Sequence, residues 1–215
     1  MLCKWMVCDV LELQKNAFST AQKQWIKIQG APGFLGQWGG WDKRNPTNAC
    51  IMGLWKKESD YQHFMNDLHD HITDDNQQAS TYKSLQVSFF QEYMPIPGHK
   101  GVTSADRPTY IRIAECFVKA DRVEHFIQTQ KELWNPGMSQ VEGMLGGHFC
   151  RHVDEPLHFL VISFWKEELS HKDYVENVFP ELRKHSHVDE ELNHLIGRFI
   201  ALESAWDVPA TKNQT

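Results

Sequence analysis

The sequence repeats itself at about half its length, and this repeat limits the fold more than any other feature. When the chain is moved along itself by 108 residues, Cys8 falls on Cys116. When it is moved by 110 residues, Trp55 falls on Trp165, and the matches keep their order. A period this long exceeds the roughly 20–50 residues of solenoid repeats. It indicates a duplicated small domain, and two such copies can pair within one chain as subunits pair in a dimer.

The bulk composition excludes several classes of protein. The chain has 215 residues, of which 41% are hydrophobic, so two small domains can each bury a core. A net charge of −6 argues against nucleic-acid binding, and no apolar run is long enough to cross a membrane. Five cysteines without a Cys-x-x-Cys pair predict no disulfide framework, no zinc site and a cytoplasmic location. Eight tryptophans suit either a core or a pocket for a flat apolar ligand.

Hydrophobic periodicity predicts the same order of elements in both copies. In the first copy we expect strands at 4–13, 34–41, 49–55 and 83–93, and helices at 15–28 and 58–72, followed by a polar loop over 73–80. In the second copy we expect strands at 110–118, 141–151, 157–165 and 196–206, and helices at 122–134 and 171–184. The predicted units are therefore 1–94 and 110–206, with a Pro- and Gly-containing linker over 95–109 and a disordered tail over 207–215.

The order β-α-β-β-α-β is that of the ferredoxin-like fold, an α+β arrangement in which two helices cover one face of an antiparallel sheet. The other face would be left bare and apolar, and such a face is an association site. We therefore expect the two sheets to pair as an intramolecular dimeric α+β barrel. A space between a sheet and its helices could hold a small-molecule ligand, and the fused pair could associate further as a homo-oligomer.

Two stretches of sequence resemble known families. The segment 53–64 and its echo at 163–168 resemble the dimeric α+β barrel superfamily, which includes the antibiotic-biosynthesis monooxygenases and the small haem-degrading monooxygenases. The segments 34–41 and 45–51 resemble the YdbC-like bacterial proteins. The resemblance implies a cofactor-independent monooxygenase that acts on an aromatic or polyketide-like molecule. The alternative is a non-catalytic binder or carrier of a small hydrophobic ligand or haem.

The haem-degrading members of that superfamily use an Asn, a Trp and a His, and this chain lacks the set in both copies. The corresponding positions hold Cys8, Phe64 and Asp74 in the first copy and Cys116, Tyr174 and Lys184 in the second. We therefore expect no cofactor, with haem binding through His185 or His187 as the alternative. The pairs His69/His71 and His185/His187 are expected at solvated helix ends, where i and i+2 point apart, so no metal is predicted.

Differences between the copies supply the catalytic candidates. Trp38 aligns with His148 and Trp41 with Arg151, so aromatic rings give way to a titratable and a cationic group. His148 is predicted as a general base and Arg151 as the partner of an anionic ligand group. The alternative is that this strand lies at an edge and meets water.

Aromatic and thiol side chains complete the predicted pocket. Its walls are expected to be Cys8, Trp38, Trp41, Trp55, Phe64, Cys116, Trp165 and Tyr174. The two tryptophans that end strands, Trp55 and Trp165, have a simpler reading as core plugs. Cys8 and Cys116 are read as small apolar fillers, with a nucleophilic role as the alternative.

Overall fold

The computed structural model describes residues 1–211, and they form two α+β units of the predicted ferredoxin-like type. Of the described residues, 1–91 and 200–211 form the first unit, and 92–199 form the second. In the first unit the strands are β1 (Leu2–Asp9), β2 (Phe34–Asp42), β3 (Asn48–Trp55) and β4 (Ser84–Ile96). Its helices are α1 (Lys15–Gln22), α2 (Glu58–Phe64) and α3 (Asp70–Asn76).

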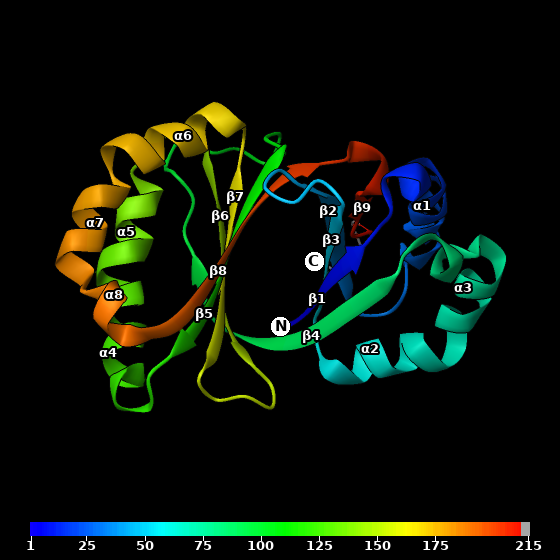
Figure 1. The fold of residues 1–215 in the computed structure, drawn as a ribbon, viewed down its shortest axis with the longest axis horizontal. Coiled ribbons are helices and arrows are strands. Elements are labelled where there is room, and N and C mark those ends of the chain that lie inside the picture. Colours follow the sequence, from blue (N-terminus) through cyan, green and yellow to red (C-terminus); the bar gives the residue numbers. More distant parts are fainter. Residues whose placement is uncertain (212–215) are drawn as a thin grey trace. The chain divides into compact units, whose positions relative to one another are not determined.

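The second unit repeats this order (Figure 1). Its strands are β5 (Tyr110–Val118), β6 (Met144–His152), β7 (His158–Trp165) and β8 (Leu192–Leu202). Its helices are α4 (Val123–Thr129), α5 (Asn135–Ser139), α6 (Glu168–Asn177), α7 (Phe179–Ser186) and α8 (Val188–Glu191). Figure 1 shows these helices gathered on one side of β5, β6 and β7.

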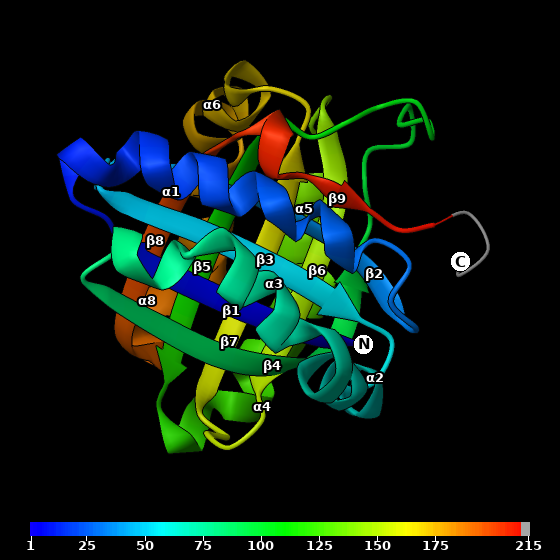
Figure 2. The same cartoon turned by 90° about the vertical axis from the view of Figure 1, so that its right-hand side faces the viewer.

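The sheets of the two units have matching registers. In the first unit β1 lies between β3 and β4 and is antiparallel to both, and β2 pairs with the far side of β3. In the second unit β7 is antiparallel to both β5 and β6. Side chains alternate between the two faces of a strand, so Lys4, Met6 and Cys8 share one face of β1. Figure 2 shows α1 and α3 lying across the strands of the first unit.

The fourth strand of each β-α-β-β-α-β order carries the chain from one unit into the other. Strand β4 begins in the first unit and ends in the second, and β8 begins in the second and ends in the first. The contacts therefore divide the chain at 91/92 and 199/200, whereas the sequence suggested 94 and 110 as limits.

The predicted disordered tail was wrong over its first residues. Val208–Pro209 forms the short strand β9, which pairs with Gly36 and Gln37 of β2. Val208 is 2% exposed and Trp206, just before it, is 1% exposed, so burial of these two side chains fixes the segment. Residues 212–215 of the predicted tail lie outside the described residues.

The polar loop predicted over 73–80 is largely helical. Helix α3 runs to Asn76, and a 3-10 helix follows over Gln78–Thr81. Gln77 joins them in the left-handed conformation, with φ of 53°. A residue other than glycine in that conformation gives no sequence signal for the end of a helix, so the boundary was placed too early.

Each unit also contains one π-helical turn, in which hydrogen bonds span five residues. In the first unit it is Met65–His69, between α2 and α3, and in the second it is Gln130–Trp134, between α4 and α5. Single π-turns inside α-helices occur often at functional sites. Among the described residues no helix has the length and apolar character needed to span a membrane.

Candidate functional site

The first unit contains a cavity of about 320 Å³ between its sheet and its helices. That volume is at the lower end of the roughly 300–1,000 Å³ of small-molecule sites. Every residue that lines it belongs to the first unit, with contributions from β1, β2, β3, both helical segments and the start of β4. The space between sheet and helices is thus where the fold predicts a ligand.

Aromatic rings form much of the cavity wall. Trp55 at the end of β3 packs edge-on against Phe34 at 5.2 Å between ring centroids, and in a tilted arrangement against Phe64 of α2 at 5.1 Å. Trp25, from the 3-10 helix Lys23–Ile28, lies 6.5 Å from Phe64. Rings held by other rings present a rigid, flat, apolar surface, which suits a planar ligand.

One cation faces this apolar wall. Lys4 of β1 lines the cavity, and its Nζ lies 5.1 Å from the centroid of the Tyr61 ring. In the part of the chain that the structure describes, no carboxylate forms an ion pair with Lys4. Burial lowers the pKa of Lys4 to about 8, because desolvation disfavours the charged amine. An anionic oxygen on a ligand would supply the missing counter-charge.

The indole N–H of Trp55 is a second polar group of the wall. In the second unit the corresponding Trp165 donates its Nε1–H to Ser163 Oγ at 2.9 Å. In the first unit Gly53 occupies the position of that serine, and Trp55 Nε1 has no hydrogen-bond partner within residues 1–211. A buried indole N–H usually finds a partner, so this donor is available to a ligand.

His69 contributes an imidazole to the wall of the cavity. It closes the π-helical turn, and its ring lies 5.8 Å from both Trp25 and Phe64. Its Nδ1 is 2.9 Å from Asp70 Oδ1, and because a carboxylate can only accept, Nδ1 carries the proton. In neutral His69 the lone pair is therefore on Nε2, which can accept a proton from a ligand.

An amide network fixes another part of the wall. Gln78 accepts the Nε1–H of Trp25 at 2.7 Å and donates its own amide to Gln22 Oε1 at 2.7 Å. Gln22 and Gln78 are both buried. A satisfied buried network holds its members in one arrangement, so Trp25 is a fixed part of the wall.

Three of the predicted pocket residues line this cavity: Cys8, Trp55 and Phe64. Burial raises the pKa of the Cys8 thiol to about 12, with Lys4 opposing the shift. The thiol is therefore protonated near neutral pH, as expected of an apolar filler, and the arrangement gives no support to a nucleophilic role.

Trp38 and Trp41 lie on β2 outside the set of cavity-lining residues. Trp41 packs instead against Phe18 and Trp206, at 5.8 Å and 5.2 Å between centroids, with Lys15 Nζ above its ring. Trp38 is half-buried. A pocket role for these two tryptophans stays a prediction.

The second unit packs its corresponding residues into a core. Cys116, Trp165 and Tyr174 belong to one buried cluster with Trp134 and Leu182. Arg112 stands where the first unit has Lys4, and its guanidinium lies 4.7 Å from the centroid of Phe199. Burial raises the pKa of Cys116 to about 12.

The predicted catalytic pair lies on β6. His148 Nδ1 is 2.7 Å from Glu92 Oε1, so its imidazole is held by a carboxylate. Arg151 donates from Nε to the carbonyl oxygen of Pro156 at 2.8 Å and lies over the ring of Phe159. Neither side chain lines the cavity of the first unit. Their catalytic roles stay predictions.

The chain does not offer the residues of the haem-degrading set. Cys8 and Phe64 line the cavity at two of the three positions, but neither side chain is the Asn or Trp of that set. The alternative ligands His185 and His187 lie around the end of α7 with side chains 62% and 65% exposed. A thiol held protonated and exposed imidazoles do not fit a buried haem pocket.

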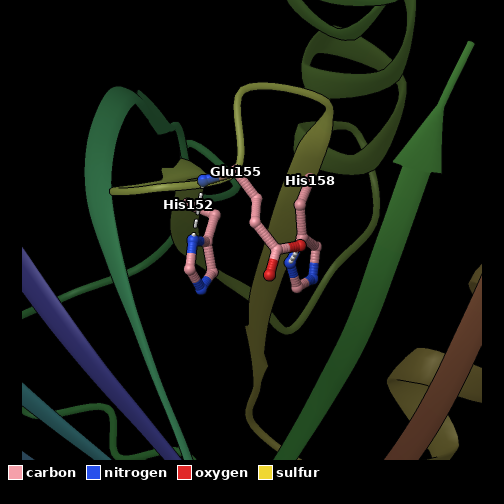
Figure 3. A group of neighbouring side chains, drawn as sticks. All are labelled: His152, Glu155 and His158. Atoms are coloured by element: carbon pink, nitrogen blue, oxygen red, sulfur yellow. Dashed lines mark hydrogen bonds and ion pairs between the residues drawn. The ribbon is translucent and has the colours of Figure 1, made fainter.

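One group of side chains has the composition of a metal site. His152, Glu155 and His158, in the hairpin between β6 and β7, bring one ligand atom each within 4.8 Å of one another (Figure 3). This group contains no His-x-His pair. Its signal in the sequence is the short connection between the strands predicted at 141–151 and 157–165, because a hairpin places the residues on its two sides next to each other.

Comparison with known proteins agrees with this architecture. The Uncharacterized protein YdbC of Bacillus subtilis (strain 168) is 37% identical over 97 residues, which cover 44% of this chain and 82% of that protein. The chain belongs to the YdbC family. Residues 2–90 match the family model "Domain of unknown function (DUF4937)", and residues 109–186 match "Antibiotic biosynthesis monooxygenase". The YdbC-like part thus contains the cavity.

Solved structures share the fold of nearly all of this chain. A protein from Lactobacillus acidophilus NCFM, titled "putative monooxygenase", superposes with a TM-score of 0.74 at 12% identity over 97% of this chain and 95% of its own. A protein titled "anthrone oxidase-like" superposes with a TM-score of 0.67 at 11% identity over 94% and 91%. At such identities the likeness shows the fold alone.

Proposed function

We propose that the first unit binds a flat aromatic or polyketide-like molecule with an ionisable oxygen, and that the chain is a cofactor-independent monooxygenase for it. The observation that carries the proposal is the amine of Lys4, which faces a cavity walled by aromatic rings without a carboxylate among the described residues. The fold shared with an anthrone oxidase-like protein supports this substrate class by analogy.

The cavity residues divide the chemistry between them. His69 would remove a proton from an acidic carbon or phenol of the substrate, and Lys4 would hold the enolate or phenolate oxygen that results. The electron-rich carbanion then reacts with O₂. For a methylene that becomes a ketone, the carbon gains one oxygen atom and the other leaves as water, so O₂ accepts all four electrons and no reductant is required. This scheme assigns to Lys4 and His69 the roles that sequence predicted for Arg151 and His148.

The cytoplasm is the proposed location. All five cysteines are free thiols and all are buried. Free thiols persist most readily in a reducing compartment. Further copies of the chain could associate as a homo-oligomer, and this part of the proposal is based on the sequence alone.

Oxygen consumption tests the proposal. The purified protein would be mixed with dithranol, a tricyclic phenolic ketone with a reactive methylene, while dissolved O₂ is measured. We expect turnover above the rate with heat-denatured protein and one O₂ consumed per dithranol. His69→Gln should lower kcat by about 10²-fold or more, the usual contribution of general base catalysis. Lys4→Met should also lower kcat, because it removes the cation that stabilises the oxyanion as it forms. His148→Ala is the matched histidine control.

Two outcomes separate the alternatives. Saturable quenching of tryptophan fluorescence without O₂ consumption would favour a carrier of small hydrophobic ligands over an enzyme. Turnover that survives His69→Gln and Lys4→Met but is lost in His148→Ala and Arg151→Ala would refute the cavity assignment and restore the pair on β6.

A further inference from the structure

The hairpin between β6 and β7 holds two histidines on either side of an exposed glutamate. His152 is the last residue of β6 and His158 the first of β7, and their rings stack at 5.0 Å between centroids. Glu155 lies in the turn, and Figure 3 shows its carboxylate beside the imidazole of His158. Its Oε2 is 3.4 Å from His158 Nδ1.

His158 is oriented by a second carboxylate behind it. Glu115 of β5 is buried, and its Oε1 is 2.9 Å from His158 Nε2. A carboxylate only accepts, so Nε2 carries the proton and the Nδ1 of a neutral ring presents a lone pair to Glu155. Phe117 stacks on the His158 imidazole at 4.2 Å between ring centroids. A histidine that donates to a carboxylate through one nitrogen and offers the other is the arrangement found in metal sites.

The imidazole of His158 lies between two carboxylates, which would favour a cation there. Two carboxylates, Glu115 and Glu155, flank one imidazole, and Glu155 faces the nitrogen that Glu115 leaves unprotonated. Two acceptors that face each other repel, unless a proton or a metal ion lies between them. A divalent ion would satisfy the carboxylate and the imidazole lone pair together.

We propose that His152, Glu155 and His158 form a binding site for a divalent transition metal ion such as Zn²⁺, with Glu115 orienting His158. Two imidazoles and one carboxylate leave a fourth position for water, the ligand set of open zinc sites. Nitrogen ligands select such ions over Mg²⁺ and Ca²⁺, which prefer oxygen. The site lies entirely in the second unit and is independent of the cavity in the first.

Closure of the site requires two small adjustments. Ligand atoms around tetrahedral Zn²⁺ are about 3.3 Å apart, from bonds of roughly 2.0–2.1 Å, so atoms now within 4.8 Å must draw closer. Glu155 is 62% exposed and free to move. His152 accepts the backbone N–H groups of Asp154 and Glu155 on Nδ1, at 3.1 Å each, so its ring must release them before Nε2 can ligate.

Metal titration of the full chain tests the proposal. Protein stripped with EDTA would be titrated with Zn²⁺ by calorimetry and with Co²⁺ by visible absorbance. We expect one ion per chain and the absorption bands of nitrogen- and oxygen-bound Co²⁺. Glu155→Gln removes an exposed ligand without disturbing the core, and should raise Kd for Zn²⁺ by about tenfold or more. Glu115→Gln should raise it by about 10–100-fold, the usual effect of an outer-shell partner.

A surface pair on α7 provides the matched control. His185 and Glu181 are also a neighbouring His and Glu, 3.9 Å apart and both exposed. Glu181→Gln should leave Kd unchanged. If Glu155→Gln binds Zn²⁺ as tightly as the parent chain, or if the Co²⁺ spectrum carries thiolate charge-transfer bands, the hairpin is not the site. Its histidines then serve only to cap the turn and to pair with Glu115.

Discussion

Lys4 and Gly53 lie directly opposite each other on neighbouring antiparallel strands, β1 and β3. Their counterparts in the second unit, Arg112 and Ser163, are opposite each other on β5 and β7 in the same register. The same pair of positions thus has different surroundings in the two units. Lys4 lines the cavity of the first unit with its amine over the Tyr61 ring, whereas the guanidinium of Arg112 lies over the Phe199 ring and Ser163 accepts the indole N–H of Trp165.

Gly53→Val should close part of the cavity. A Cβ added at Gly53 meets only Trp55 Nε1, at 3.8 Å, so the larger side chain enters open space without backbone strain. We expect the affinity for dithranol to fall about tenfold or more, which corresponds to about 1.4 kcal/mol. Stability should be unchanged or higher by up to about 1 kcal/mol, because glycine weakens a strand. Fluorescence quenching and thermal unfolding measure the two effects.

Ser163→Gly is the control for that substitution, since it makes the opposite change at the equivalent position of the second unit. It should leave ligand affinity unaltered. Equal affinity in Gly53→Val and the parent chain would show that the ligand binds elsewhere.

Lys4 should make the affinity for an anionic ligand depend on pH. The pKa of Lys4 is lowered to about 8 by burial, so the amine is charged at pH 7 and neutral at pH 10. We expect the affinity for an aromatic carboxylate such as 2-naphthoate, which stays ionised throughout, to fall as pH rises through 8. Lys4→Met should bind it more weakly at pH 7 and with no change across this range. A parent profile that is flat from pH 7 to 10 would contradict the assigned role.

The same lysine should cost stability at neutral pH. Between pH 8 and 10.5 the unfolded chain keeps a proton on Lys4 that the folded chain has lost, so the contribution of Lys4 to stability rises with pH across that window. Above pH 9 the buried thiols of Cys8 and Cys116 act in the opposite direction, because they stay protonated only in the folded chain. Below pH 8 the whole cost is present, at most about 3 kcal/mol for this change in pKa. Lys4→Met should therefore be more stable than the parent chain in urea at pH 7, by a margin that shrinks as pH rises toward 10.5, whereas exposed Lys172→Met should match the parent chain.

His171 should make the second unit sensitive to acid. Burial among Tyr110, Trp165 and neighbouring rings lowers its pKa to about 4, with Arg112 adding to the shift. As pH falls from 6.5 to 4 the unfolded chain gains a proton that folded His171 does not, so up to about 3 kcal/mol of stability is lost. His171→Phe should remove this loss, as followed by urea unfolding between pH 7 and 4.

Asp207 acts in the opposite direction over nearly the same range. Burial raises its pKa to about 6, so the folded chain holds a proton from pH 6 to 4 that the unfolded chain has released. This stabilises the fold as pH falls, and it masks part of the His171 effect. The comparison is therefore made in an Asp207→Asn background. An acid profile that His171→Phe does not alter there would contradict the prediction.

Periodicity predicted the fold well where burial alternates along the chain. The strand over 110–118 coincides with β5, because its side chains alternate between the two faces of the sheet. Periodicity failed where contacts between distant parts of the chain decide whether a segment is ordered. Trp206 and Val208 lie in a polar C-terminal stretch, and only their burial in the first unit shows that the segment is ordered.

The candidate site was predicted only in part, for a physical reason. Comparison of the copies drew attention to the exchange of large rings for charged groups on β2 and β6. The exchange that shapes the cavity is smaller, from Arg112 to Lys4 and from Ser163 to Gly53. A lysine in a strand is expected to face water, and only the structure shows that the face it shares with Met6 and Cys8 lines the cavity.

The cavity thiol should be unreactive in the folded chain. Burial raises the pKa of both Cys8 and Cys116 to about 12, so at pH 8 about one thiol in 10⁴ is ionised, against a substantial fraction of an exposed cysteine. We expect iodoacetamide to modify them at pH 8 about 10³-fold more slowly than in urea, as measured by mass spectrometry of peptides. Because the charge of Lys4 partly offsets the burial of Cys8, Lys4→Met should slow Cys8 further and leave Cys116 unaffected. Rapid modification of Cys8 in the native protein would instead restore the thiol as a nucleophile, with Lys4 as the cation that activates it.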